Sequence, residues 1–347
     1  MKRPTHRDIA LIAGVSHVAV SLALRGHPSI PKGTRERIEK AARQIGYRPD
    51  PALQALMVYR RNAKPSSYQG TLAWINNYRS HPDKLKQQFS KYLIGAQQRC
   101  AELGYHLEEF RMVDLDMNFK RLSKVLRARN IQGLLFPPQE RQKHITKANF
   151  DWENFSLIAF GFSLMRPRLD VVTNAQFHST RMAVRKLRSL GYRRIGFVVE
   201  SRFNERSDQN FLAGFLIEQR HFLPSERVPL HLIPGGTDAE RLQSFQKWFS
   251  RQKPDVILAV SGVLPDYYRS LSRAEVQQCG LAIMDIPDDN TELSGINQHN
   301  LIIGRTAVDT LVAKIHANER GIPVTPRRIL IEGRWMAGTT APRIAGK

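Results

Sequence analysis

Residues 5–24 carry the pattern that most restricts how this chain can fold. Thr5 is a residue type that caps a helix, and apolar residues follow it at helical spacing. Gly14 can adopt the positive φ that ends this first helix, and Ser16 can cap a second helix directly after it. Two short helices joined by so tight a turn indicate a helix-turn-helix, whose second helix lies in the DNA major groove.

The second predicted helix divides into an inward apolar side and an outward side. We expect the outward side to contact base edges through His17, Val18, Ser21, Leu22 and Arg25. Val18 and Leu22 can touch only thymine methyl groups or exclude wrong bases, and packing of Leu22 into the core is the alternative. Polar residues around the two helices are expected to hold phosphates: Thr5, Ser16, Lys32, Thr34 and Tyr47.

A third helix is predicted from Thr34 to Ala42, and Gly46 ends it. Asp50 then caps, and Pro51 opens, a short apolar segment that reaches Met57. So few residues do not hold a helix alone, because helix nucleation is unfavourable. An ordinary linker between domains is the other interpretation of this segment.

This stretch resembles the headpiece of the lactose-repressor (LacI/GalR) family of transcription regulators. The matching pieces stand in register: Asp8-Ile9-Ala10, Ala13-Gly14-Val15-Ser16, Thr34-Arg35, Gly46-Tyr47-Arg48-Pro49 and Leu56. The resemblance implies that the hinge segment folds on DNA and pushes Leu56 between base steps of the minor groove. Asp50 stands where the family has asparagine, so repulsion between its charge and the DNA phosphates is expected to weaken a minor-groove hydrogen bond at this position.

Bulk properties agree with a DNA partner and exclude several classes of protein. The net charge is +22, and residues 1–64 hold 13 Lys/Arg against 4 Asp/Glu, a net of +9. Two cysteines, Cys100 and Cys279, make no disulfide framework and suggest a reducing compartment. Neither a signal-like N-terminal run nor a membrane-spanning stretch is visible, so we expect a cytoplasmic protein.

From about Tyr68 the sequence alternates between predicted strands and helices. Apolar runs predict strands over 70–75, 106–110, 133–136, 157–160, 194–199, 256–260 and 281–284, with amphipathic helical patterns between many of them. Such alternation favours parallel sheets covered by helices on both faces. Two such halves place a ligand cleft between them, at the carboxyl ends of the strands.

This region also resembles the periplasmic-binding-protein-like core of the same family, through Leu190–Gly196, Phe211–Phe215 and Pro254–Val256. The expected fold is an all-α helix-turn-helix headpiece followed by a two-lobed α/β core with doubly wound parallel sheets. We place the headpiece at 1–47, the hinge helix and linker at 48–66, and the effector-binding and dimerisation core at 67–341. Within the core, the N-lobe takes about 67–174 and 296–320, and the C-lobe about 175–295 and 321–341.

The chain departs from the family at the positions that usually hold an effector. Phe211 replaces a ligand-holding arginine, Gly161 replaces an aspartate, and Ser261-Gly262 replaces an Asn-Asp pair, whereas Asp285 keeps its family type. Either other residues bind the effector, or the ligand is not a simple sugar. The alternative is that the polar residues near these positions are loop residues and helix caps. The candidate effector-binding residues are Arg206, Asp208, Gln209, Phe211, Asp285, Gln298 and His299.

No catalytic or metal-binding motif is present, so we expect no enzyme activity, no metal and no cofactor. The predicted function is a sequence-specific transcription regulator, with repression favoured because most relatives repress. Its expected partners are a pseudo-palindromic DNA operator, a second copy of the chain and a small-molecule effector, with a carbohydrate derivative as one candidate. A cytoplasmic solute-binding protein and an effector-independent architectural DNA-binding protein are the two alternatives.

Overall fold

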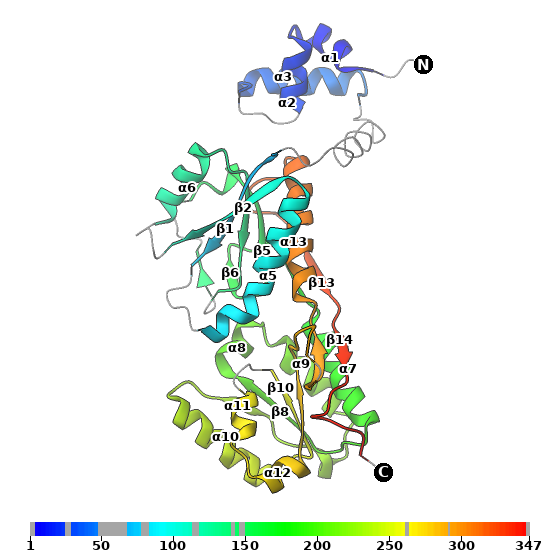
Figure 1. Ribbon diagram of the computed structural model, residues 1–347. Coiled ribbons are helices and arrows are strands. Elements are labelled where there is room, and N and C mark those ends of the chain that lie inside the picture. The colour runs from blue at the N-terminus through cyan, green and yellow to red at the C-terminus, as the bar shows by residue number, and fades with distance from the viewer. Residues whose placement is uncertain are drawn as a thin grey trace.

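The computed structural model consists of a small helical headpiece and two α/β lobes (Figure 1). It describes residues 4–24, 29–47, 68–77, 83–112, 118–139, 143–145, 150–260, 264–290 and 292–344. The predicted hinge at 48–66 lies outside the described residues. Among the described helices, none is long and apolar enough to span a membrane alone. Taken together, α1 (His6–Ala13) and α2 (His17–Leu24) have the length and composition of a span, but they are bent by 104° relative to each other.

The headpiece packs α1, α2 and α3 (Lys32–Gln44) around a small apolar core. Gly14 ends α1 with φ 62°, as the sequence predicts, and the Val15 amide donates to the Ala10 carbonyl at 3.1 Å. Ile9 is fully buried, but Ile12 is 50% exposed, so the inward side of α1 is narrower than its apolar spacing suggests.

The first lobe is built on a six-stranded sheet in which every neighbouring pair is parallel. Its strands, in spatial order, are β13 (Arg328–Ile331), β7 (Asp170–Asn174), β5 (Ser156–Phe160), β3 (Gly133–Phe136), β1 (Gly70–Asn76) and β2 (Tyr105–Arg111). One face is covered by α5 (Asp83–Glu102) and α13 (Asn300–His316), and the other by α6 (Phe119–Ala128) and η1 (Trp152–Asn154). A two-stranded ribbon, β4 (Lys143–His144) and β6 (Leu164–Arg166), lies apart from this sheet.

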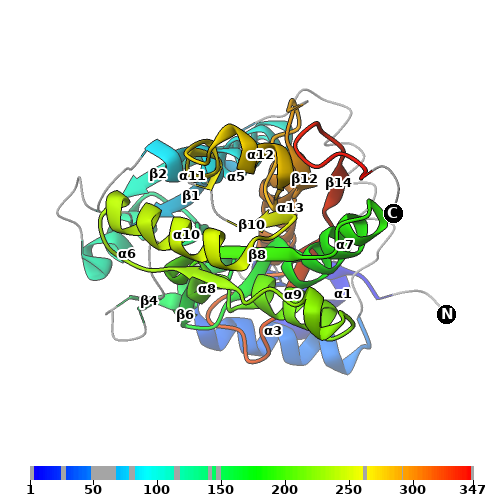
Figure 2. The same cartoon turned by 90° about the horizontal axis from the view of Figure 1, so that it is seen from below.

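The second lobe repeats this plan with one antiparallel edge strand. Its strands, in spatial order, are β14 (Arg334–Met336), β12 (Ser294–Asn297), β11 (Gly280–Ile283), β10 (Val256–Ala259), β8 (Ile195–Glu200) and β9 (His231–Ile233). Figure 2 shows helices on both sides of this sheet. One side holds α7 (Gln176–Ser189) and α9 (Asn210–Gln219), and the other α10 (Asp238–Gln252), α11 (Leu264–Arg269) and α12 (Arg273–Gln278). The short helices α8 (Ser201–Arg206) and η2 (Pro224–Glu226) complete the lobe.

The chain passes between the two sheets three times. It leaves the first sheet after β7, returns after β12, and leaves again between β13 and β14. The last crossing corrects the predicted lobe boundary at residue 320, because β13 pairs with β7 and therefore keeps residues 321–331 with the first lobe. The sequence misplaced this crossing because β13 is short and has no helix after it.

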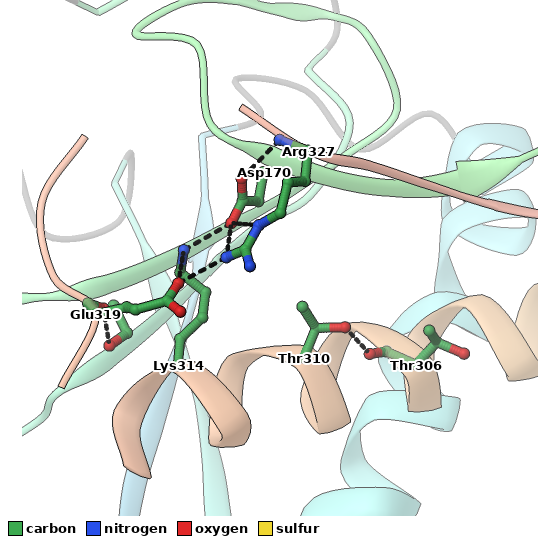
Figure 3. Close-up of polar contacts among 7 residues, drawn as sticks. Asp170, Thr306, Thr310, Lys314, Glu319 and Arg327 are labelled. Carbon is green, nitrogen blue, oxygen red and sulfur yellow. Dashed lines mark hydrogen bonds and ion pairs between the residues drawn. The ribbon is translucent and has the colours of Figure 1, made fainter. Parts of the chain in front are cut away.

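A partly buried group of charges joins the last helix of the first lobe to its sheet (Figure 3). The Asp170 carboxylate accepts hydrogen bonds from Lys314 Nζ at 2.6 Å and from Arg327 at 2.9 Å. Glu319 lies beside both cations, 2.6 Å from Arg327 and 3.4 Å from Lys314. The side chains of Asp170 and Lys314 are only 4% and 6% exposed, so each needs the other as a partner.

Candidate DNA-binding and effector sites

Helix α2 presents the side predicted to reach DNA. His17 is exposed and Val18 is 64% exposed, whereas Val20 and Ala23 are buried against the rest of the headpiece. Leu22 is half-buried and does not belong to the apolar cluster of the described headpiece. Its placement therefore favours the base-facing interpretation over the core interpretation.

The residues predicted to hold phosphates divide into caps and accessible groups. The Thr5 hydroxyl donates to Asp8 at 2.7 Å, and Ser16 Oγ accepts from the Ala19 amide at 3.1 Å, so both act as helix caps. Lys32 is exposed and Thr34 half-buried at the start of α3. Three further predicted DNA-binding residues lie outside the described residues: Arg25, Asp50 and Leu56.

Three aromatic rings meet at the start of α1 and α2. The Tyr47 hydroxyl and His6 Nε2 are 2.8 Å apart, and the His6 ring centroid is 5.5 Å from that of His17. His6 was not singled out from the sequence, because only the fold brings residues 6 and 47 together. The contact holds the Tyr47 side chain beside the first turn of α1, where it remains a candidate for a phosphate contact.

A small pocket lies where the two lobes meet, and its empty space is about 400 Å³ when the part that is open to solvent is counted. The first lobe lines it with residues from the carboxyl ends of β3, β5 and β7 and with Tyr92 of α5, and the second lobe with residues of α7, α8, α9 and the segment after β12. This is the location predicted from the two-lobed pattern. Its lining residues are Tyr92, Pro138, Gly161, Phe162, Ser163, Thr173, Asn174, Gln176, Phe203, Arg206, Ser207, Phe211 and Gln298.

A chain of buried amides links the lobes at this pocket. The Asn174 side chain donates from Nδ2 to Gln298 Oε1, and Gln298 Nε2 donates to the Met284 carbonyl. Gln176 Nε2 donates to Asn174 Oδ1 at 3.2 Å, and Thr173 Oγ1 donates to the same oxygen at 3.1 Å. These bonds join the end of β7 in one sheet to the end of β12 in the other, so they depend on how the lobes are arranged.

Three of the seven predicted effector residues line the pocket: Arg206, Phe211 and Gln298. Asp208 and Gln209 do not; both are exposed, with φ of 52° and 56°, in the turn between α8 and α9. His299 forms the left-handed N-cap of α13 with φ 53°, and its amide donates to Asn297 Oδ1 at 2.8 Å. For these three residues, the alternative interpretation as turn and cap residues describes their positions.

Asp285 also lies outside the pocket lining. Its carboxylate accepts a hydrogen bond from Asn300 Nδ2 at 2.9 Å, and Asn300 begins α13. The contact joins the end of β11 to the helix that covers the first sheet. The sequence could place Asp285 at the end of a strand, but the partner that occupies it follows a crossing fifteen residues later.

We expect Asp285→Ala to lower the melting temperature and to leave effector affinity unchanged. The variant removes the carboxylate that holds the Asn300 amide, and a charge-assisted hydrogen bond contributes on the order of 1.5–3 kcal/mol. Thermal unfolding and effector titration on the same preparation measure the two quantities separately. A tenfold loss of effector affinity with an unchanged melting temperature would return Asp285 to the ligand site.

The cysteines and acidic residues give no sign of a second kind of site. Cys100 and Cys279 are buried, and burial raises the pKa of the Cys100 thiol to about 12. In the part of the chain that the structure describes, no group of three His, Cys, Asp or Glu residues could hold a metal ion. Both cysteines therefore occupy buried positions in the lobes.

A helix-turn-helix joined to a two-lobed core with an interlobe pocket defines a ligand-responsive DNA-binding regulator. Residues 5–50 match the sequence profile of "Bacterial regulatory proteins, lacI family". The HTH-type transcriptional regulator MalR of Streptococcus pneumoniae is 21% identical over 336 residues, covering 94% of this chain and 97% of MalR. Residues 5–50 therefore form a LacI-family DNA-binding domain, and the chain is similar to a LacI-family transcription regulator over nearly its whole length.

Solved structures show the same fold. A lac repressor dimer bound to operator and the anti-inducer ONPF is 18% identical, with a TM-score of 0.58, and the match covers 98% of this chain and 100% of that one. The transcriptional regulator CelR in complex with cellobiose is 17% identical, with a TM-score of 0.57, and the match covers 97% and 100% of the two chains. The predicted fold and the predicted function, a DNA-binding regulator controlled by a small molecule, are confirmed.

Proposed function

We propose that this chain represses transcription as a homodimer that binds a two-fold symmetric operator and takes its effector in the interlobe pocket. The observation that carries the proposal is the pairing, in one chain, of an exposed helix-turn-helix side with a pocket between two lobes. A symmetric dimer would set two copies of α2 in successive major grooves, which requires a palindromic site.

Each DNA-binding residue has a role in this proposal. The exposed side of α2 reads base edges through His17, Val18, Ser21 and Leu22. Lys32, Thr34 and Tyr47 hold phosphates and so set the register of the headpiece without reading sequence. The sequence adds Arg25 at the end of α2, Asp50 at the hinge and Leu56 as the minor-groove wedge.

Regulation follows from linkage between the pocket and the hinge. A ligand that prefers one arrangement of the lobes shifts their equilibrium, and with it the spacing of the two hinge segments in a dimer. The Asn174–Gln298 hydrogen bond supports this proposal because it spans the lobes and lines the pocket. The cellobiose complex of CelR makes a carbohydrate derivative one candidate effector for this chain.

We expect DNA selected from a random-sequence pool to contain a two-fold symmetric motif. Affinity for that site should fall on the order of a thousandfold between 50 and 200 mM salt, because several phosphate contacts release counterions. Fluorescence anisotropy with the selected duplex gives the affinity, and sedimentation of the complex gives two chains per duplex.

The matched control for this experiment is full-length Val20→Asp. Val20 is fully buried in the headpiece, so an aspartate there places an unpaired charge in its core and should abolish specific binding. The core lobes should keep their thermal transition in this variant. Enrichment of sequences without two-fold symmetry, or equal binding by the variant, would overturn the proposed function.

A further inference from the structure

The interlobe pocket has a distinctive balance of side chains. Arg206 is the one formally charged residue among the described residues that line it, and no described carboxylate lines it. Aromatic rings supply much of the apolar wall: Tyr92, Phe162, Phe203 and Phe211. A pocket of this composition offers a guanidinium group to a ligand and an apolar wall to a flat body.

The position of Arg206 strengthens its effect on a ligand. The residue ends α8, is only 9% exposed, and its guanidinium carbon lies 5.8 Å from the centroid of the Phe203 ring. A charge in such surroundings acts more strongly than one in water, because the effective dielectric constant is lower. A guanidinium also matches a carboxylate or phosphate group by two parallel hydrogen bonds.

The same pocket offers no described carboxylate to accept hydrogen bonds from the hydroxyl groups of a neutral sugar. Sugar hydroxyls lose water when they bind, and a carboxylate is the strongest acceptor that a protein can offer them. The two acidic residues that the sequence predicts for the effector site lie outside the lining: Asp208 is exposed in a turn, and the Asp285 carboxylate accepts a hydrogen bond from Asn300. The first lobe ends its middle strand with Gly161, which brings no side-chain acceptor to the pocket.

Gln176 brings to the lining a buried acceptor without a partner in the described part of the chain. Gln176 is 8% exposed, and its Oε1 atom is buried with no hydrogen-bond partner among the described residues. Its Nε2 atom donates to Asn174, which fixes the orientation of the amide and leaves the oxygen as the remaining group. A hydroxyl or amino group on the ligand would satisfy that oxygen.

We propose that the effector is a small organic acid with a planar apolar body and a hydroxyl or amino donor. Its acidic group binds Arg206, its donor binds Gln176 Oε1, and its body lies against the aromatic wall. This inference rests on the proposed function, since it takes the interlobe pocket as the effector site.

The test compares matched acids and neutral compounds on the full-length protein. The probes are benzoate, 4-hydroxybenzoate, 4-aminobenzoate, the neutral isostere 4-hydroxybenzamide, and the neutral sugars cellobiose and ribose. We expect at least one of the acids to raise the melting temperature, and 4-hydroxybenzoate to bind at least tenfold more tightly than 4-hydroxybenzamide by calorimetry. The hydroxylated or aminated acids should bind more tightly than benzoate.

Two variants assign the contacts and one serves as the control. Arg206→Gln should weaken binding of all three acids at least tenfold. Gln176→Leu should weaken binding of 4-hydroxybenzoate and 4-aminobenzoate and leave the affinity for benzoate unchanged. Arg202→Gln is the control, because Arg202 is an exposed arginine of the same helix that does not line the pocket. It should bind the probes as the unmodified protein does.

The inference is overturned if no acid in the panel binds, or if the amide binds as tightly as its acid. Its failure is distinct from failure of the proposed function. If cellobiose or ribose binds, and Phe211→Ala abolishes that binding, the interlobe pocket remains the effector site and only the acid class is wrong. Absence of any two-fold symmetric operator would instead overturn the proposed function as a transcription regulator.

Discussion

Asp170→Ala should lower the free energy of unfolding of the first lobe by about 3–5 kcal/mol, the cost of breaking a buried ion pair from one side. The variant leaves the Lys314 ammonium, 6% exposed, with only the longer 3.4 Å contact to Glu319. It also removes the acceptor of the Arg327 backbone amide, which lies 2.8 Å from the Asp170 carboxylate. Urea unfolding followed by tryptophan fluorescence measures the loss, since Trp74 and Trp152 lie in this lobe.

The effect of this variant should depend on pH. Burial acts to raise the pKa of Asp170, but hydrogen bonds from Arg327 and Lys314 outweigh it and hold the pKa below its ordinary value of 3.8. A carboxylate whose folded pKa is depressed contributes stability above its unfolded pKa and loses it as pH falls through the folded value. The difference between wild type and variant should therefore be constant near neutral pH and shrink below about pH 4.

Glu319→Ala is the control for Asp170→Ala. Glu319 contacts the same two cations, but its side chain is 48% exposed, so its pairs are screened by water. We expect a loss of about 1 kcal/mol or less. Equal losses in the two variants, or a loss for Asp170→Ala that stays the same at pH 3, would mean that burial does not govern this group of charges.

Gly304→Ala should destabilise the first lobe by about 1–3 kcal/mol, although alanine is the better helix former. A Cβ atom at position 304 would lie 2.1 Å from the Tyr92 carbonyl oxygen, and one at Gly95 would lie 2.2 Å from the Leu301 carbonyl oxygen. The backbones of α5 and α13 therefore touch, and even one methyl group must push the helices apart. Tyr92 also lines the pocket, so effector affinity should fall as well.

Gly33→Ala is the matched control, because it makes the same substitution in a helix with open surroundings. A Cβ atom at position 33 of α3 meets nothing within 4 Å. Alanine should stabilise the headpiece there by up to about 1 kcal/mol. Thermal unfolding of both variants checks the contrast, and a neutral Gly304→Ala would show that the two helices separate without cost.

Local patterns predicted most of the elements of this fold. Buried runs such as Gly133–Phe136 and capped, glycine-ended helices such as α1 are visible in a short window of sequence, and the structure places them there. The sequence predicted poorly what depends on distant partners. β13 is assigned to a lobe only by its pairing with β7, which lies more than 150 residues earlier.

The same limit explains which site residues were found. Arg206 and Gln298 belong to two polar clusters that the sequence offers in place of the missing family residues, and both line the pocket. Asn174 and Gln176 were missed because β7 was not recognised as a strand, although a polar pair directly after Asp170–Thr173 was the available signal. The type and position of Asp285 in the sequence could not reveal that its carboxylate accepts a hydrogen bond from Asn300.

The three crossings between the sheets also govern the order in which a newly made chain can fold. Asp170 and Arg327 are 157 positions apart, an interval that a ribosome takes roughly 10–30 s to translate. The headpiece is contiguous and can fold soon after it emerges, but the first lobe must wait for α13 and β13 to cover and complete its sheet. For that interval the nascent chain carries a DNA-binding unit without a finished sensor, and it exposes apolar surface that makes this lobe the one most in need of a chaperone.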